Sequence, residues 1–217
     1  KGALAIILHT CEFPEGNTWA KRITKEAIKV LSGRDEIGVI DYEGGEQWVV
    51  ELNDVGDYEA MSTKINAAEP GDMPSFAPTM ELGLKALEKS DAASKHMIII
   101  SDGDPVPPPP QLLKAFVTEG ISVSTVSIFP HGGQEVSIMR SIAELTKGRY
   151  YFPDDPNKLP TIFFKEARTL KRNLVFKGDV TVQQGFVSPV MRGIESIPHL
   201  DGYVLTSLKE TGLPEEI

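Results

Sequence analysis

A short stretch near the middle of the chain, Lys95–Pro105 (KHMIIISDGDP), constrains the fold more than any other. Met97–Ile100 is a run of four apolar residues, three of them β-branched, which is typical of a parallel strand covered by helices on both faces. The run ends at Ser101–Asp104 (SDGD), so two carboxylates directly follow the strand. In open α/β sheets, ligands bind outside the carboxyl ends of the strands. We therefore expect a functional site at this edge of a sheet.

Strand and helix patterns alternate along the rest of the chain. The short Gly44-Gly45 connection predicts one antiparallel hairpin, whereas the other strands are separated by helical crossovers. The expected strands are Ala3–Leu8, Glu36–Tyr42, Gln47–Leu52, Met97–Ile100, Ile121–Phe129 and Arg149–Phe152; the expected helices run from an Asn17 or Thr18 cap to Leu31 and over Asp57–Ala67, Phe76–Leu87, Gln111–Glu119, Glu135–Thr146 and Asp155–Leu170. This order predicts an α/β fold with a doubly wound, mostly parallel six-stranded sheet, one antiparallel edge strand and helices on both faces.

Helical periodicity predicts which side chains face the core. We expect inward-facing residues at Phe76, Met80, Leu84 and Leu87 of the helix before the central strand, and at Ile138, Met139, Ile142 and Leu145 of helix Glu135–Thr146.

The alternation of strands and helices ends at Lys171. Short extended pieces, expected at Leu174–Phe176, Asp179–Val182, Phe186–Val190 and Tyr203–Leu208, are separated by glycine and proline. Because a segment of this size cannot build a core of its own, residues 171–217 either add to the sheet domain or begin a neighbouring, truncated domain. We favour the second alternative and expect residues 1–170 to form one domain. The chain starts at Lys1 without an initiator methionine, so we expect it to be an excerpt of a longer protein.

Composition excludes several classes of partner. The net charge is −9 and no run of lysine or arginine occurs, which argues against nucleic acid and against anionic lipid surfaces. No apolar run approaches the roughly 18 residues that cross a bilayer, so we expect no direct membrane insertion by this segment. The single cysteine, Cys11, excludes an internal disulfide.

Several of these segments resemble a von Willebrand factor type A domain. Ile100–Gly103 is similar to the end of the family's fourth strand, Ser75–Pro78 is similar to the segment after its glycine-threonine loop, and the resemblance covers residues 1–170. Ile162–Ala167 and Ile197–Val204 resemble a narrower group of bacterial membrane-anchored proteins, in which the domain is embedded in a glutamine-amidotransferase-like module. The resemblance implies a soluble domain of a bacterial membrane-anchored parent, with the side of the membrane undetermined.

Family members with a working metal-ion-dependent adhesion site hold Mg²⁺ or Mn²⁺ with an Asp-x-Ser-x-Ser loop, a threonine and a second aspartate. In this chain His9, Cys11 and Phe13 stand at the three positions of the first loop, and Pro74 stands at the threonine position. Asp102 alone matches. Because a hard dication needs several oxygen ligands, we expect a degenerate site with no metal and no other cofactor.

Two other metal sites remain open alternatives. An imidazole, a thiolate and a carboxylate from His9, Cys11 and Asp102 would suit Zn²⁺. Asp102 with Glu12, Asp72 or Asp104 would instead form a non-standard Mg²⁺ or Mn²⁺ site. The simpler interpretation is that His9 hydrogen-bonds within its loop and Cys11 packs as a small apolar residue.

No catalytic motif is present. The chain has no Gly-x-Ser-x-Gly elbow, no Walker loop and no dinucleotide-binding glycine pattern. Cys11 and His9 are close in sequence, but this proximity is not the geometry that a catalytic dyad needs. We therefore expect no enzyme activity.

These observations leave binding as the expected function. We hypothesise a metal-independent protein-interaction module that uses the loops at the carboxyl edge of the sheet. Its candidate residues are His9, Cys11, Glu12, Asp72, Pro74, Ser75, Asp102 and Asp104. The segment Pro107–Pro110, expected to be rigid and exposed, adds a surface that loses little entropy on binding. The alternative is a structural scaffold domain that binds nothing itself.

Overall fold

The computed structural model describes residues 1–9, 14–153, 175–181, 189, 192–193 and 199–204. The chain divides into two compact units, Lys1–Lys171 and Arg172–Ile217. In the described part of the chain, no helix is both long and apolar enough to cross a bilayer.

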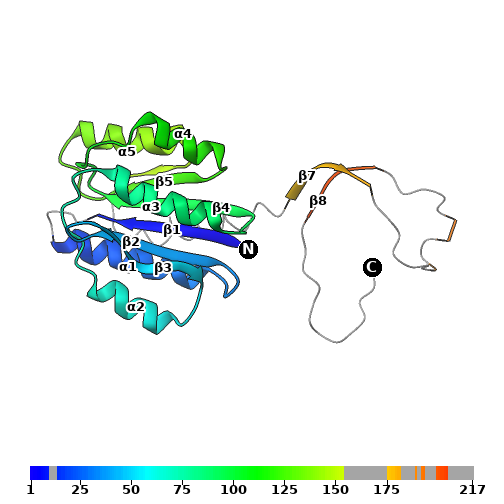
Figure 1. The fold of residues 1–217 in the computed structure, drawn as a ribbon, viewed down its shortest axis with the longest axis horizontal. Coiled ribbons are helices and arrows are strands. Elements are labelled where there is room, and N and C mark those ends of the chain that lie inside the picture. Colours follow the sequence, from blue (N-terminus) through cyan, green and yellow to red (C-terminus); the bar gives the residue numbers. More distant parts are fainter. Residues whose placement is uncertain (10–13, 154–174, 182–188, 190–191, 194–198, 205–217) are drawn as a thin grey trace. The chain divides into compact units, whose positions relative to one another are not determined.

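The first unit is a three-layer α/β structure with a six-stranded sheet (Figure 1). The strands lie in the order β3-β2-β1-β4-β5-β6, and all neighbours are parallel except the β2–β3 hairpin. The elements are β1 Gly2–Leu8, α1 Pro14–Val30, β2 Glu36–Tyr42, β3 Glu46–Asp54, α2 Tyr58–Ala67, α3 Phe76–Lys89, β4 Ser94–Ser101, α4 Pro110–Thr118, β5 Ser122–Ser127, α5 Gly133–Leu145 and β6 Tyr150–Tyr151. The expected fold class, with its single antiparallel edge strand, is confirmed.

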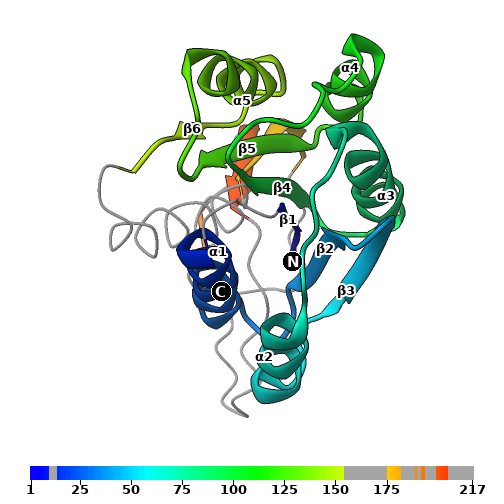
Figure 2. The same ribbon diagram turned by 90° about the vertical axis from the view of Figure 1, so that its left-hand side faces the viewer.

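The two central strands, β1 and β4, form the middle of the core. Every residue of β1 is buried, and Met97–Ile100 of β4 are fully buried. Successive side chains point to opposite faces, so the strands contribute to two apolar clusters, one under α1 and α2 and one under α3, α4 and α5 (Figure 2). Burying each of these large side chains contributes about 1.5–3 kcal/mol, so the relative position of β1 and β4 is held firmly.

The register of these strands determines which residues meet at the carboxyl edge. Leu8 of β1 is paired with Ile100 of β4, and Ser101 of β4 is paired with Ser127 of β5. The residues that follow, His9 and Asp102, therefore leave the sheet side by side. This placement follows from parallel pairing, because carboxyl ends of parallel strands meet at one edge.

Helix α1 begins earlier than the sequence patterns indicate. It starts at Pro14, so Asn17 and Thr18 lie inside the helix and do not cap it. Proline is favoured in the first turn because its φ is already helical and its missing N–H would be unpaired there anyway.

The prediction for α5 is partly wrong. Met139 and Ile142 are buried as expected and Ile138 is half-buried, but Leu145 is 62% exposed. Leu145 lies six residues after Met139, a rotation of about 600°, which turns it away from the buried face. Ala143 is buried on that face instead. All four inward positions expected in α3 are confirmed.

The second unit contains one described hairpin. Strand β7, Val175–Val180, pairs antiparallel with β8, Leu200–Val204. The two extended pieces expected at 174–176 and 179–182 fall, as far as they are described, on the single strand β7, and its pairing with β8 shifts register between Lys177 and Val180. The expected helix 155–170 and most of the piece at 186–190 lie outside the described residues. That residues 171–217 begin a further domain stays a prediction.

One carboxylate lies inside the core of the first unit. Asp41 on β2 is fully buried, and neither of its carboxylate oxygens accepts a hydrogen bond from the part of the chain that the structure describes. Burial raises the pKa of the Asp41 carboxyl, and a weaker interaction with the Gln47 side chain opposes this shift.

Substitutions in α5 test the position of its buried face. Met139→Ala should lower the free energy of unfolding by about 2–5 kcal/mol because it leaves a cavity. Leu145→Ala should change it by no more than about 0.5 kcal/mol because the side chain is already in solvent. Urea denaturation of both variants measures the difference, and equal losses would show that Leu145 packs inward.

Asp41→Asn tests the buried carboxylate. A raised pKa means that the native state binds a proton more readily than the unfolded state, so the wild type loses stability as pH rises through that pKa. The asparagine variant does not titrate, and at pH 7.5 it should be more stable than the wild type by about 1–3 kcal/mol. Denaturation at pH 4 and pH 7.5 measures this, with the exposed Glu51→Gln as control. An advantage of Asp41→Asn that does not grow with pH would contradict the assignment.

Candidate functional site

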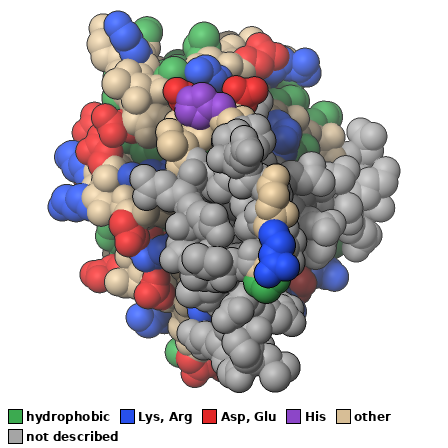
Figure 3. Space-filling view, turned by 90° about the vertical axis from the view of Figure 1, so that its right-hand side faces the viewer, with side chains coloured by type: hydrophobic (Ala, Val, Ile, Leu, Met, Phe, Trp, Pro, Cys, Tyr) green, Lys and Arg blue, Asp and Glu red, His purple; other side chains and the backbone are tan. Residues whose placement is uncertain are grey.

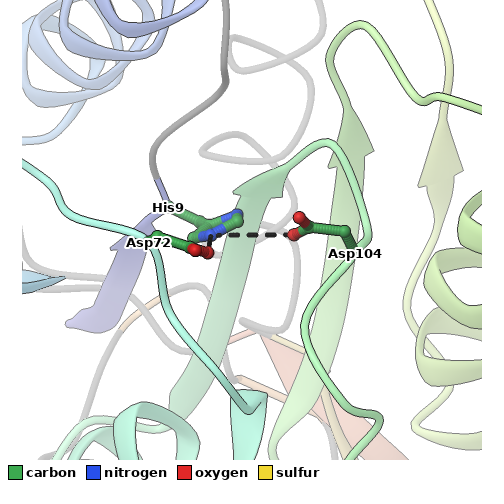
Figure 4. A group of neighbouring side chains, drawn as sticks. All are labelled: His9, Asp72 and Asp104. Atoms are coloured by element: carbon green, nitrogen blue, oxygen red, sulfur yellow. Dashed lines mark ion pairs between the residues drawn. The ribbon is translucent and has the colours of Figure 1, made fainter.

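Loops from three parts of the chain meet at the carboxyl edge of the sheet (Figure 4). His9 follows β1, the segment Asp72–Ser75 precedes α3, and Asp102–Asp104 follow β4. The His9 backbone N–H donates to the Ile100 carbonyl at 3.0 Å, so β1 and β4 stay paired up to the site.

The second and third loops are tied to each other by their backbones. The Val106 N–H donates to the Pro74 carbonyl at 3.1 Å, and the Phe76 N–H donates to the Val106 carbonyl at 3.1 Å. Gly103 has φ +99° and packs against Glu135 of α5, where an added Cβ would lie 2.8 Å from the Glu135 Cβ. Only glycine fits this turn, which brings Asp104 back toward the sheet.

His9 lies at the centre of the site and is 1% exposed. Its Nδ1 lies 2.9 Å from the Ser101 Oγ and 3.3 Å from the Asp102 Oδ1. Its Nε2 accepts a hydrogen bond from the Met73 backbone N–H at 3.2 Å. Because an N–H donor faces Nε2, this network assigns the ring proton to Nδ1. One imidazole therefore joins the loops that follow β1, precede α3 and follow β4.

Asp102 is also buried, with 2% exposure. The Ser101 hydroxyl donates to its Oδ1 at 3.4 Å, and the Asp104 backbone N–H donates to the same oxygen at 3.4 Å. Burial on its own raises the pKa of the Asp102 carboxyl, but the hydrogen bond and charge of His9, together with the Asp104 contacts, outweigh burial and hold it below the usual value. Asp102 is therefore a carboxylate at neutral pH.

Two more carboxylates face the other side of the His9 ring. The Asp72 Oδ1 and the Asp104 Oδ1 lie 3.9 Å and 3.8 Å from Nε2 (Figure 4). Asp72 is 88% exposed and Asp104 is 40% exposed. Burial and the nearby charge of Asp102 raise the pKa of Asp104 to about 6, and Asp72 adds to the shift. The group crowds negative charge around a single imidazole.

His131 is a site residue that the sequence patterns did not single out. Its Nε2 lies 3.7 Å from the Asp102 Oδ2, and it sits in the loop after β5. The sequence could have indicated His131 through its position after the predicted strand Ile121–Phe129, because this strand ends at the same edge of the sheet as the strand before Asp102. Phe129 in the same loop is 42% exposed and has φ +51°, an uncommon conformation for an aromatic residue. His96, by contrast, is buried on β4, with its Nδ1 2.7 Å from the Ser122 Oγ.

The structure brings His9, Asp72, Asp102 and Asp104 together. The contacts of Pro74 and Ser75 are different: the Pro74 carbonyl joins two loops, and the Ser75 Oγ caps α3 by accepting from the Ala77 N–H at 3.2 Å. Cys11 and Glu12 lie outside the described residues, so the alternatives that include them are not tested.

The segment Pro107–Pro110 is not exposed along its whole length, in contrast to the expectation from the sequence. Pro107 and Pro109 are exposed, but Pro108 is buried, and Pro110 is the first residue of α4. The neighbouring Val106 is 61% exposed and presents an apolar side chain beside the site.

The residues present do not fit the Mg²⁺ or Mn²⁺ site of the adhesion pattern. His9 replaces its first aspartate, and Pro74 replaces its threonine with a side chain that has no oxygen. The remaining ligand, Asp102, faces His9. The positions of the adhesion pattern that the structure describes therefore supply one oxygen ligand, whereas a hard dication needs several.

Comparison with protein families identifies a match over most of the first unit. The family model of the von Willebrand factor type A domain matches residues 13–165. No curated protein sequence matches the chain.

Solved structures share the fold at low sequence identity. BatB from Bacteroides thetaiotaomicron, described as a conserved hypothetical protein, superposes with a TM-score of 0.63 and 16% identity over 79% of this chain and 98% of its own. An aerotolerance-related membrane protein from Bacteroides fragilis gives 0.59 and 13%, over 77% of this chain and 98% of its own. Proximal thread matrix protein 1 from mussel byssus, with a zinc-occupied metal-ion-dependent adhesion site, gives 0.62 and 16%, over 81% of this chain and 49% of its own.

His9→Ala tests the central contact. The variant leaves the buried Asp102 carboxylate and the Met73 N–H without their partner, and it should lose about 3–5 kcal/mol of stability at pH 7. The pKa of Asp102 is lowered by His9, so this stabilisation is present at neutral pH, begins to be lost as pH falls below about 4, and continues to fall as pH passes through the lowered native pKa. Urea denaturation at pH 7 and pH 3.5 measures both effects.

The double variant His9→Ala/Asp102→Asn is the control. It removes the unpaired charge and should recover part of the loss at pH 7, because the two residues are energetically coupled. Additive losses in the double variant would mean that His9 and Asp102 do not interact.

Proposed function

The chain belongs to the von Willebrand factor type A domain family, and we propose that it is a protein-interaction module. In this proposal the partner binds to the loops at the carboxyl edge of the sheet, and binding needs neither Mg²⁺ nor Mn²⁺. Domains of this family commonly mediate protein–protein contacts and are generally not enzymes. The candidate binding residues are those of the His9, Asp72–Ser75 and Asp102–Asp104 loops.

The observation that carries the proposal is the network around His9. In family members with a working adhesion site, a cation joins the loops. In this chain the imidazole contacts Ser101 and Asp102 through Nδ1 and the Met73 N–H through Nε2. These contacts are made by a side chain of the protein itself, so they hold the loops in place without an exchangeable ion. A loop surface that is already ordered loses less conformational entropy when it binds a partner.

The surroundings of the site support a protein partner. Val106 and Phe129 are large exposed apolar residues in loops at this edge, and Asp72 and Asp104 lie in the loops between α2 and α3 and after β4. Apolar anchors beside polar groups are the usual composition of a protein interface. The net charge of −9 does not favour a polyanionic partner. Figure 3 faces the amino ends of the strands of the first unit, on the side away from the site, and there the described lysine and arginine side chains lie among acidic residues. Nucleic acid is therefore not the partner that we propose.

We extend the proposal to the parent protein. A bacterial membrane-anchored parent is supported by the fold shared with BatB and with the aerotolerance-related membrane protein. Within it, residues 1–170 would be the interaction domain, and residues 171–217 would begin the neighbouring domain.

Substituting one exposed apolar residue tests the proposed surface. Val106→Asp should weaken partner binding at least tenfold because it places a charge in the interface, whereas its backbone bonds to Pro74 and Phe76 remain. Leu145→Asp is a matched control, because Leu145 is 62% exposed against 61% for Val106 but lies at the far end of α5. The partner is first recovered by affinity capture with the wild type, and its affinity for each variant is then measured in EDTA.

A partner that binds both variants equally would place the interface elsewhere. Loss of wild-type binding in EDTA that returns with Mg²⁺ would refute metal independence. Failure to recover any partner would favour the alternative, a scaffold domain that binds nothing itself.

A further inference from the structure

We infer that His9, Asp72 and Asp104 form a binding site for a borderline transition-metal dication, for which Zn²⁺ is the natural probe. The three ligand atoms come from three separate loops and all lie within 4.8 Å of one another. This ligand set differs from that of the adhesion pattern, because Asp102, the residue retained from that pattern, is not among the ligands.

The state of the His9 ring is the first argument. Its Nδ1–H points at Ser101 and at the buried Asp102 carboxylate, which leaves the lone pair on Nε2. Metal-binding histidines typically donate their other ring N–H to a carboxylate in this way, because the contact orients the ring and increases the basicity of the ligating nitrogen. Asp102 thus has the position of a supporting carboxylate behind the ligand.

The distances are the second argument. A tetrahedral zinc ion with bonds of about 2.1 Å separates its ligand atoms by about 3.4 Å. The Asp72 and Asp104 oxygens lie 3.9 Å and 3.8 Å from Nε2 (Figure 4), so each distance exceeds the tetrahedral separation from this nitrogen by only about half an ångström. All three ligand atoms lie within 4.8 Å of one another, so a modest inward movement of the carboxylates completes the site. Asp72 is 88% exposed and is free to make this adjustment.

The donor atoms select the metal. One imidazole nitrogen with two carboxylate oxygens suits Zn²⁺ and its neighbours in the transition series, whereas Mg²⁺ favours an octahedral shell of oxygens. Three protein ligands leave a fourth position for water or for an incoming group. Within the described residues, Asp72 and Asp104 have no lysine or arginine ion pair, so no basic side chain there competes with a cation for these carboxylates.

Coordination has a structural consequence. Nε2 would exchange the Met73 N–H for the metal, and the loop that carries Met73 would then be held through Asp72 instead. The metal would therefore keep the same loops joined. This inference does not rest on the proposed function, since it concerns residues of this chain alone.

Calorimetric titration of the full chain with zinc chloride at pH 7.5 tests the site. A Cys11→Ser background removes the only thiol, so that a cysteine cannot account for the heat. We expect one equivalent of zinc to bind, and Asp72→Asn and Asp104→Asn each to weaken binding at least tenfold. Both residues are exposed enough for the variants to fold, which circular dichroism checks.

Glu69→Gln is the matched control, because it removes an exposed negative charge from the same loop as Asp72 but lies outside the cluster. It should change the affinity less than twofold. Absence of zinc binding, or binding that survives both asparagine variants, would overturn the inference. Equal weakening by Glu69→Gln would also overturn it, because it would reveal general electrostatic attraction. The titration contains no partner, so either outcome leaves the proposed interaction to its own test.

Discussion

The contact between the His9 imidazole and the Asp102 carboxylate is the interaction on which the carboxyl edge depends. Both side chains are almost fully buried, so their attraction acts in an environment of low polarity and neither has water as a substitute partner. Each alone would be costly to bury. Together with Ser101 and the Met73 N–H they satisfy one another, and the loops after β1 and β4 and before α3 become one unit.

This arrangement changes what the edge can do. A bound cation can be exchanged or removed, whereas an imidazole belongs to the chain and is always present. The loops are then organised from the moment of folding, and the carboxylates of Asp72 and Asp104 remain available on the outer side of the ring. In the two proposals made above, the same ring takes the place of the cation that joins the loops and offers one nitrogen to a softer metal.

Much of the architecture was predictable from local patterns. Met97–Ile100 was recognisable as a buried parallel strand, and the Gly44-Gly45 turn identified the antiparallel edge, because hydrophobic runs and glycine turns report directly on burial and on chain reversal. Errors arose where a residue lies at the margin of a pattern. Leu145 was expected on the buried face of α5, but its position along the helix turns it away from that face and it is exposed. Pro14 begins α1 in a stretch that was expected to be a loop.

The sequence by itself determined the fold class and the presence of acidic residues after the central strand, since periodicity and strand endings are properties of short segments. The sequence also showed that this chain lacks the hydroxyl side chains that act as ligands in the metal-ion-dependent adhesion site. Tertiary structure decided which of the remaining groups meet. His9 and Ser101 are 92 residues apart, and His9 and Met73 are 64 residues apart. The first contact exists because parallel pairing of β1 with β4 aligns the carboxyl ends of both strands. The second exists because backbone hydrogen bonds between Pro74 and Val106 hold the loop before α3 against the loop after β4. No local pattern encodes either geometry.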